Sequence, residues 1–169
     1  MPEPHPNEAV ALKVGDAAPD FTLYNAAGQA LHLSSALVEG PLALVFYRGD
    51  WCAWCQNQLI QLAALYERIQ SHGADLWAIS PQSENVNQAL RERRGLPFPI
   101  LADVDQAVMR AWGVFKEVDP EGRAIPYPST YIVNQDGCIH WRHLGLGMRD
   151  RPQAREVLAA VTELTNGNQ

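Results

Sequence analysis

The chain has 169 residues, of which 47% are hydrophobic and 19% are charged, and its formal net charge is −6. This length and hydrophobic content exclude an intrinsically disordered protein, and they fit one globular domain whose core needs no disulfide support. The negative net charge argues against a protein that binds nucleic acid through a basic surface.

The first part of the chain predicts a tail and a hairpin. Residues 1–12 are polar and proline-rich, and we expect a flexible tail there, ahead of a single domain over residues 13–169. Two short apolar runs, FTLY and ALHLS, flank a turn at Gly28, which predicts a β-hairpin within residues 15–37.

Strands and helices then alternate. The continuous apolar run at residues 42–47 predicts a strand that is buried on both faces. Residues 52–72 carry apolar side chains at helical spacing and precede Gly73, which predicts an amphipathic helix. Further strands are predicted at residues 76–80, 97–101, 129–133 and 138–144, and further helices at residues 84–94, 105–112 and 153–164, with a loop between 112 and 129. The alternation, closed by a hairpin, predicts an α/β fold with a mixed central sheet.

The sequence carries no signal for a membrane or for export. No apolar run approaches the roughly 18 residues that a membrane-spanning helix needs, and the N-terminus lacks the basic and apolar regions of a secretory signal. Three cysteines without an export signal indicate a reducing environment, so we expect a cytoplasmic protein. Cys138 follows a turn and is interpreted as a small buried strand residue.

The segment FYRGDWCAWC places Cys52 and Cys55 where the predicted strand meets the predicted helix. Backbone N–H groups at a helix N-terminus stabilise an anion, and the thiolate is the reactive form of cysteine. An ordinary thiol, with a pKa of about 8.5, is only a few per cent ionised at neutral pH, whereas a decrease of about two units makes most of it thiolate. Because the second thiol lies one helical turn away, the spacing predicts a redox pair that can close a disulfide.

Other interpretations of this motif are weaker. A four-coordinate structural zinc site needs two more cysteine or histidine ligands, usually from a second closely spaced pair. The remaining cysteine, Cys138, is solitary, so we expect no metal. Trp51 precedes the first cysteine and is interpreted as a wall of the site.

Five segments in the same order resemble peroxiredoxins of the AhpC/TSA (thiol-specific antioxidant) class: VGDAAPDFTL, FYRGDWCAWC, LWAIS with the following PQS, GLPFPILAD and PSTYIVNQDG. They are most similar to the peroxiredoxin-like branch that bears RGxWCxxC. The resemblance covers nearly the whole predicted domain. It implies a thioredoxin-like three-layer α/β/α sandwich and thiol-dependent reduction of hydroperoxides without a bound cofactor.

The peroxiredoxin pattern PxxxTxxC aligns with residues 48–55, and this chain departs from it. Cys55 falls on the position of the peroxidatic cysteine, Cys52 replaces the threonine and Arg48 replaces the proline. Gln58 stands where many members carry a glutamate. Since the pattern's hydroxyl donor is missing, we treat Arg48 as the cationic donor that positions the substrate, because a guanidinium stays charged and offers several N–H groups.

A second departure concerns the segment PSTYIV. Pro128 stands where related peroxiredoxins often carry the arginine that orients peroxide, and it resembles the cis-proline that faces WCxxC in thioredoxins and TlpA-type proteins. Thr130, two residues on, lies in the strand expected beside the cysteines. The resemblance therefore adds Pro128 and Thr130 to the predicted substrate-positioning residues.

Three functions remain open from the sequence. In a peroxidase, Cys55 is oxidised to a sulfenic acid, Cys52 condenses with it, and a thioredoxin- or glutaredoxin-like donor reduces the disulfide. In a thiol-disulfide oxidoreductase, Cys52 attacks a protein disulfide and Cys55 resolves the mixed disulfide. The third function is a non-enzymatic redox sensor. The sequence does not determine the oligomeric state, and a homodimer is one candidate assembly.

Overall fold

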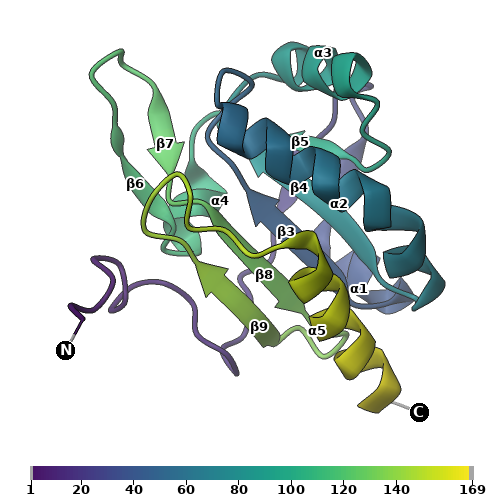
Figure 1. The fold of residues 1–169 in the computed structure, drawn as a ribbon. Helices are drawn as coiled ribbons and strands as arrows, with labels where there is room; N and C mark the ends of the chain where they lie inside the picture. Colours follow the sequence, from purple (N-terminus) through teal and green to yellow (C-terminus); the bar gives the residue numbers. More distant parts are fainter. Residues whose placement is uncertain (1, 168–169) are drawn as a thin grey trace.

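Strand β3 (Leu42–Phe46) is buried along its whole length, so both faces of the sheet around it must be covered. The computed structural model describes residues 2–167 and contains six other strands in the same sheet: β1 (Thr22–Tyr24), β2 (Ala30–His32), β4 (Asp75–Ser80), β5 (Ile100–Ala102), β8 (Ser129–Val133) and β9 (Ile139–Leu144). Their order is β2-β1-β5-β4-β3-β8-β9 (Figure 1). β3, β4 and β5 are parallel, and all other neighbours are antiparallel, which confirms the predicted mixed sheet.

Helices cover the two faces of this sheet. The helices are α1 (Leu33–Glu39), α2 (Ala53–Ser71), α3 (Glu84–Arg94), α4 (Ala107–Ala111) and α5 (Ala154–Gly167). Helices α2, α3 and α5 pack on the face that presents Val45, whereas α1 and α4 pack on the face that presents Phe46. Because side chains alternate along a strand, β3 contributes to both cores, and the three-layer α/β/α prediction is confirmed.

Two elements differ from the sequence prediction. Helix α1 begins at Leu33, inside the segment predicted to end the first hairpin. The carboxylate of Asp20 accepts a hydrogen bond of 3.0 Å from the Ser34 N–H, so a residue 14 positions upstream satisfies the free N-terminus of the helix. A window of local sequence does not contain that partner.

The predicted loop before β8 contains a second difference, the separate hairpin of β6 (Phe115–Val118) and β7 (Ala124–Pro126). The carboxylate of Asp119 accepts hydrogen bonds from the backbone N–H groups of Glu121 and Arg123, which closes the turn. This hairpin projects from the body of the molecule (Figure 1).

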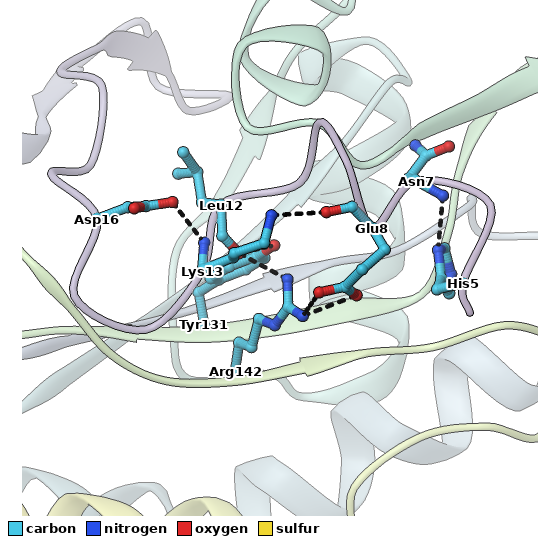
Figure 2. Close-up of polar contacts among 8 residues, drawn as sticks. All are labelled: His5, Asn7, Glu8, Leu12, Lys13, Asp16, Tyr131 and Arg142. Carbon is cyan, nitrogen blue, oxygen red and sulfur yellow. Dashed lines mark hydrogen bonds and ion pairs between the residues drawn. The ribbon is translucent and has the colours of Figure 1, made fainter.

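The N-terminal segment runs beside β9 (Figure 2). The Glu8 carboxylate accepts two hydrogen bonds, of 2.8 and 2.9 Å, from the Arg142 guanidinium, and Arg142 also donates to the Leu12 carbonyl oxygen. The Asn7 side chain donates to the carbonyl oxygens of Gly113 and Phe115. These contacts dock the segment in this conformation, and the flexibility expected for residues 1–12 stays a prediction. No helix in the part of the chain that the structure describes is long and apolar enough to cross a membrane.

Candidate active site

Cys52 is the residue that caps helix α2. Its backbone is extended, with φ −92° and ψ 108°, and its Sγ accepts a hydrogen bond of 3.3 Å from the Cys55 N–H. Strand β3 ends six residues earlier, so the sulfur sits at the strand-to-helix junction that the sequence predicted. Both thiols are free, and the two residues are 3% and 0% exposed. The site is therefore largely shielded from water.

The two thiols have opposite pKa shifts because they share one proton. The Cys55 thiol donates to the Cys52 sulfur, and this bond, with the backbone N–H of Cys55 and the charges of Arg151 and Arg48, lowers the pKa of Cys52 to about 6 despite partial burial. The same bond, together with burial, raises the pKa of Cys55 well above its ordinary value, although the Arg151 charge opposes that rise. Cys52 is therefore the sulfur that ionises first.

Arg151 is the cation that contacts the sulfurs. One Nη atom lies 3.1 Å from the Cys55 Sγ and 4.0 Å from the Cys52 Sγ, and the other donates to the Gln58 side-chain oxygen at 2.7 Å. The amide at position 58, in place of the family's frequent glutamate, thus orients the guanidinium without neutralising it. Pro128 occupies the position at which related peroxiredoxins often carry an arginine. In this chain, the guanidinium beside the sulfurs comes instead from Arg151.

The loop that carries Arg151 joins β9 to α5 and is held at several points. The Asp150 carboxylate pairs with the His143 ring at 2.8 Å and accepts from the Leu146 N–H at 2.8 Å. Burial favours a higher pKa for Asp150, but these two partners outweigh it and lower that pKa. The loop is thereby fixed near the thiols.

Sequence reasoning missed Arg151, although topology contains a signal for it. Phe46 pairs with Ser129, and Ser129 pairs with Leu144. The loop after β9 therefore lies at the same end of the strands as the loop that leads from β3 to the cysteines. A basic residue in that loop can reach the thiols once strand order is known.

The Arg48 guanidinium makes no hydrogen bond to either sulfur within residues 2–167, and its role as donor to substrate stays a prediction. Only 9% of the residue is exposed, and its Nε has no hydrogen-bond partner among the described residues. The guanidinium lines a cleft of about 390 Å³ together with Trp51. Trp51 is 37% exposed. The Arg123 guanidinium lies over the Trp51 ring, with its central carbon 3.6 Å from the centre of that ring.

Pro128 and Thr130 lie at the start of β8. No peptide bond within the described chain is cis, so the resemblance of Pro128 to the thioredoxin proline does not extend to its isomer. Thr130 pairs with Val45 and therefore points to the face of the sheet that α2 covers. Its hydroxyl is fully buried and has no hydrogen-bond partner among the described residues. A free buried donor on the cysteine side fits the predicted positioning role.

Cys138 lies away from the pair. It immediately precedes β9, at the strand end opposite Leu144, and its backbone bridges to Ala17. The prediction of a buried strand residue is wrong in detail, because Cys138 is half-buried and forms only an isolated bridge before the strand begins.

Comparisons with known proteins agree with this geometry. The family described as AhpC/TSA matches residues 14–142. The thiol-disulfide oxidoreductase ResA of Geobacillus thermodenitrificans is 29% identical over 133 residues, which cover 78% of this chain and 70% of the relative. A putative peroxiredoxin of Mycobacterium tuberculosis is 32% identical over 131 residues, which cover 76% of this chain and 82% of the relative.

The fold has a close structural counterpart. The crystal structure of the peroxidoxin BcpB from Mycobacterium tuberculosis superposes with a TM-score of 0.80 at 23% identity, covering 90% of this chain and 98% of that one. This likeness confirms the thioredoxin-like fold. The family match spans most of the chain and includes the cysteine motif, β8 and much of β9. The chain therefore belongs to the AhpC/TSA family, among the peroxiredoxin-like proteins of thioredoxin-like fold.

Proposed function

We propose that Cys52 and Cys55 are the redox pair through which this thiol-dependent peroxidase reduces hydroperoxides. The observation that carries the proposal is the position of Arg151, within 3.1 Å of the Cys55 sulfur and 4.0 Å of the Cys52 sulfur at the start of α2. A guanidinium there stabilises both a thiolate and the negative charge that develops on a leaving oxygen.

In the first step, the Cys52 thiolate attacks one oxygen of the hydroperoxide. A sulfur–oxygen bond forms and the oxygen–oxygen bond breaks, so the sulfur is oxidised to a sulfenic acid and the leaving alkoxide takes up a proton to become an alcohol. The lowered pKa of Cys52 supports this order, because about nine-tenths of a thiol with a pKa of about 6 is ionised at pH 7.

In the second step, Cys55 resolves the sulfenic acid. Oxidation removes the negative charge on Cys52, and with it the main reason for the raised pKa of Cys55, while Arg151 stays in contact. The Cys55 thiol then loses its proton and attacks the Cys52 sulfur. A disulfide bond forms, the sulfur–oxygen bond breaks, and the hydroxide leaves as water.

This order reverses the one that the family pattern implies, in which Cys55 is the peroxidatic residue. Arg48, Trp51, Pro128 and Thr130 are proposed to position the substrate from around the pair. A thioredoxin- or glutaredoxin-like donor is proposed to return the disulfide to two thiols. The predicted cytoplasmic location and homodimer stay predictions.

A second candidate function is thiol-disulfide exchange with a protein. The low pKa of the first cysteine in WCxxC and the similarity to ResA both favour it, because that activity also begins with a Cys52 thiolate.

One experiment tests both functions. Consumption of hydrogen peroxide and reduction of insulin disulfides are measured for the wild type, Cys52→Ser, Cys55→Ser and the control Cys138→Ser. We expect peroxide consumption in the wild type and control, and a sulfenic acid that dimedone traps on Cys52 of Cys55→Ser after one equivalent of peroxide. A sulfenic acid found instead on Cys55 of Cys52→Ser transfers the nucleophile to Cys55. Insulin reduction without peroxide consumption favours the second function.

A further inference from the structure

A cleft separate from the Arg151 contact opens beside the cysteine loop. Its volume is about 390 Å³, and its lining includes Arg48 and Trp51 from the loop after β3, Gln82 from the loop after β4, and Arg123 from the β6–β7 hairpin. This volume lies in the lower part of the range for small-molecule sites, roughly 300–1,000 Å³. The cleft therefore suits a small molecule or one end of a longer one.

Arg48 is a largely buried cation of this cleft that lacks an ion pair with a carboxylate among the described residues. Only 9% of the residue is exposed. Among residues 2–167, its Nε has no hydrogen-bond partner, and no carboxylate lies within 4.0 Å of its nitrogens. A buried guanidinium is costly unless an anion or hydrogen-bond acceptor compensates it. Since it hydrogen-bonds to neither sulfur, its donors remain available to a ligand.

The other charged side chains near the cleft have polar partners. Arg123 bonds the Asp119 carboxylate at 2.8 Å and Glu121 at 3.3 Å. The Asp50 carboxylate accepts from the Gln82 amide at 2.8 Å, and Gln82 in turn accepts from the Asp50 N–H. Arg48 is therefore the arginine of this lining that forms no ion pair with a carboxylate among residues 2–167.

Trp51 and Arg123 form a stacked part of the cleft lining. The Arg123 guanidinium stacks on the Trp51 indole at 3.6 Å, which joins the β6–β7 hairpin to the cysteine loop. Because Arg123 is held by its own carboxylates, its contribution is to fix Trp51, and the charge that selects a ligand is that of Arg48.

We propose that Arg48 binds a carboxylate of the small molecule that reacts at the cysteine pair. A guanidinium without a carboxylate partner matches one carboxylate of a ligand, whose two oxygens fit its donor fork. The carboxylate belongs either to an organic hydroperoxide or to a thiol reductant, two sources of the same chemistry. This assignment of substrate class rests on the proposed function.

Kinetic comparison of acids with their own esters separates these sources. One arm uses linoleic acid hydroperoxide and its methyl ester, and the other uses glutathione and its diethyl ester as reductant. We expect the acid to show a KM about tenfold lower than its ester in one arm, and Arg48→Met to abolish the difference there. Any effect of Arg48 on the thiolate acts equally on acid and ester and cancels in the ratio.

Arg93→Met is the matched control, because it removes the same charge from an exposed position of α3. Equal KM values for acid and ester in both arms of the wild type overturn the proposal, while turnover of hydrogen peroxide leaves the proposed function intact. Arg48→Gln replaces Arg48→Met if the latter fails to fold.

A binding measurement keeps the inference testable without turnover. Butyrate and the uncharged butyramide are titrated into the Cys52→Ser protein, and tryptophan fluorescence is followed with Trp51→Phe as the control for the signal. We expect saturable binding of butyrate, weakened at least tenfold by Arg48→Met, and no saturation by butyramide. Equal binding of both probes overturns the proposal even if no hydroperoxide is consumed.

Discussion

At the scale of single residues, the site depends on how one guanidinium and two sulfurs share charge. Cys55 donates a proton toward Cys52, and Arg151 lies nearer to Cys55 than to Cys52. This arrangement suits two successive steps, because the thiolate that exists first is on Cys52 and the one needed second is on Cys55. The sign of each pKa shift follows from which sulfur accepts the shared hydrogen bond.

Arg151→Met is expected to slow the reaction by raising the pKa of Cys52. In Cys55→Ser protein with Arg151 intact, alkylation of Cys52 by iodoacetamide should rise as the pH rises through its pKa, because only the thiolate reacts. Loss of the Arg151 charge raises that pKa, so the midpoint of the pH profile moves upward and the alkylation rate at pH 7 falls.

Arg149→Met is the control for this prediction, since Arg149 lies in the same loop but stands over the Trp54 ring at 5.1 Å. An unchanged pH midpoint after Arg151→Met would show that the guanidinium does not act on the thiolate.

At the scale of elements, three segments meet at one end of the sheet, where β3 and β9 finish and β8 begins. The N-terminus of α2 supplies the sulfurs, the start of β8 supplies Pro128 and Thr130, and the loop between β9 and α5 supplies Arg151. Gly145 ties two of these segments together, because its N–H donates to the Pro128 carbonyl oxygen at 2.9 Å. A methyl group there would collide with the carbonyl oxygens of Pro128 and Asp150.

Gly145→Ala is therefore expected to displace the Arg151 loop. We predict a loss of about 1–3 kcal/mol in the free energy of unfolding, measured in urea, and a larger fractional loss of peroxidase rate under conditions where the variant stays folded. Gly147→Ala, two residues on, meets no atom within 4 Å and should leave both quantities near wild type. Equal behaviour of the two variants would contradict the role given to Gly145.

At the scale of the whole molecule, the N-terminal segment connects distant parts of the chain. Glu8 reaches Arg142 in β9 (Figure 2). The Leu12 N–H donates to the Trp112 carbonyl oxygen at 3.2 Å. The hydrogen bond from Arg142 lowers the pKa of Glu8. Docking is thus complete at neutral pH and is lost as the pH falls through that lowered pKa, when the carboxylate takes up a proton.

Glu8→Gln is expected to loosen this segment without unfolding the domain. Amide hydrogen exchange at Ala11 and Leu12 should become a few-fold faster, because an exposed ion pair contributes little to global stability but orders the chain beside it. Glu3→Gln is the control, since Glu3 is exposed. High salt should reproduce the effect in the wild type by screening the pair. Unchanged exchange in Glu8→Gln would mean that Asn7 and the backbone bonds suffice.

The sequence by itself determined the parts of this protein that depend on local pattern. The apolar run of β3 and the helical spacing of α2 predicted the strand-to-helix junction, and that junction with WCAWC predicted the redox pair. The helix predicted at residues 84–94 is confirmed as α3, where the Ser83 hydroxyl caps the first turn and Gly95 adopts φ 62° after the last. Such signals lie within a few residues of the structure that they specify.

Only the tertiary structure decided what depends on partners far apart in the chain. Asp20 completes the N-terminus of α1 from 14 residues away, and Arg151 reaches Cys55 across 96 positions because β3, β8 and β9 are neighbours. The tertiary structure also buries the Nε of Arg48 without a hydrogen-bond partner among the described residues, which no spacing in the sequence reveals. Charge and pKa depend on distance in space, and the fold alone sets those distances.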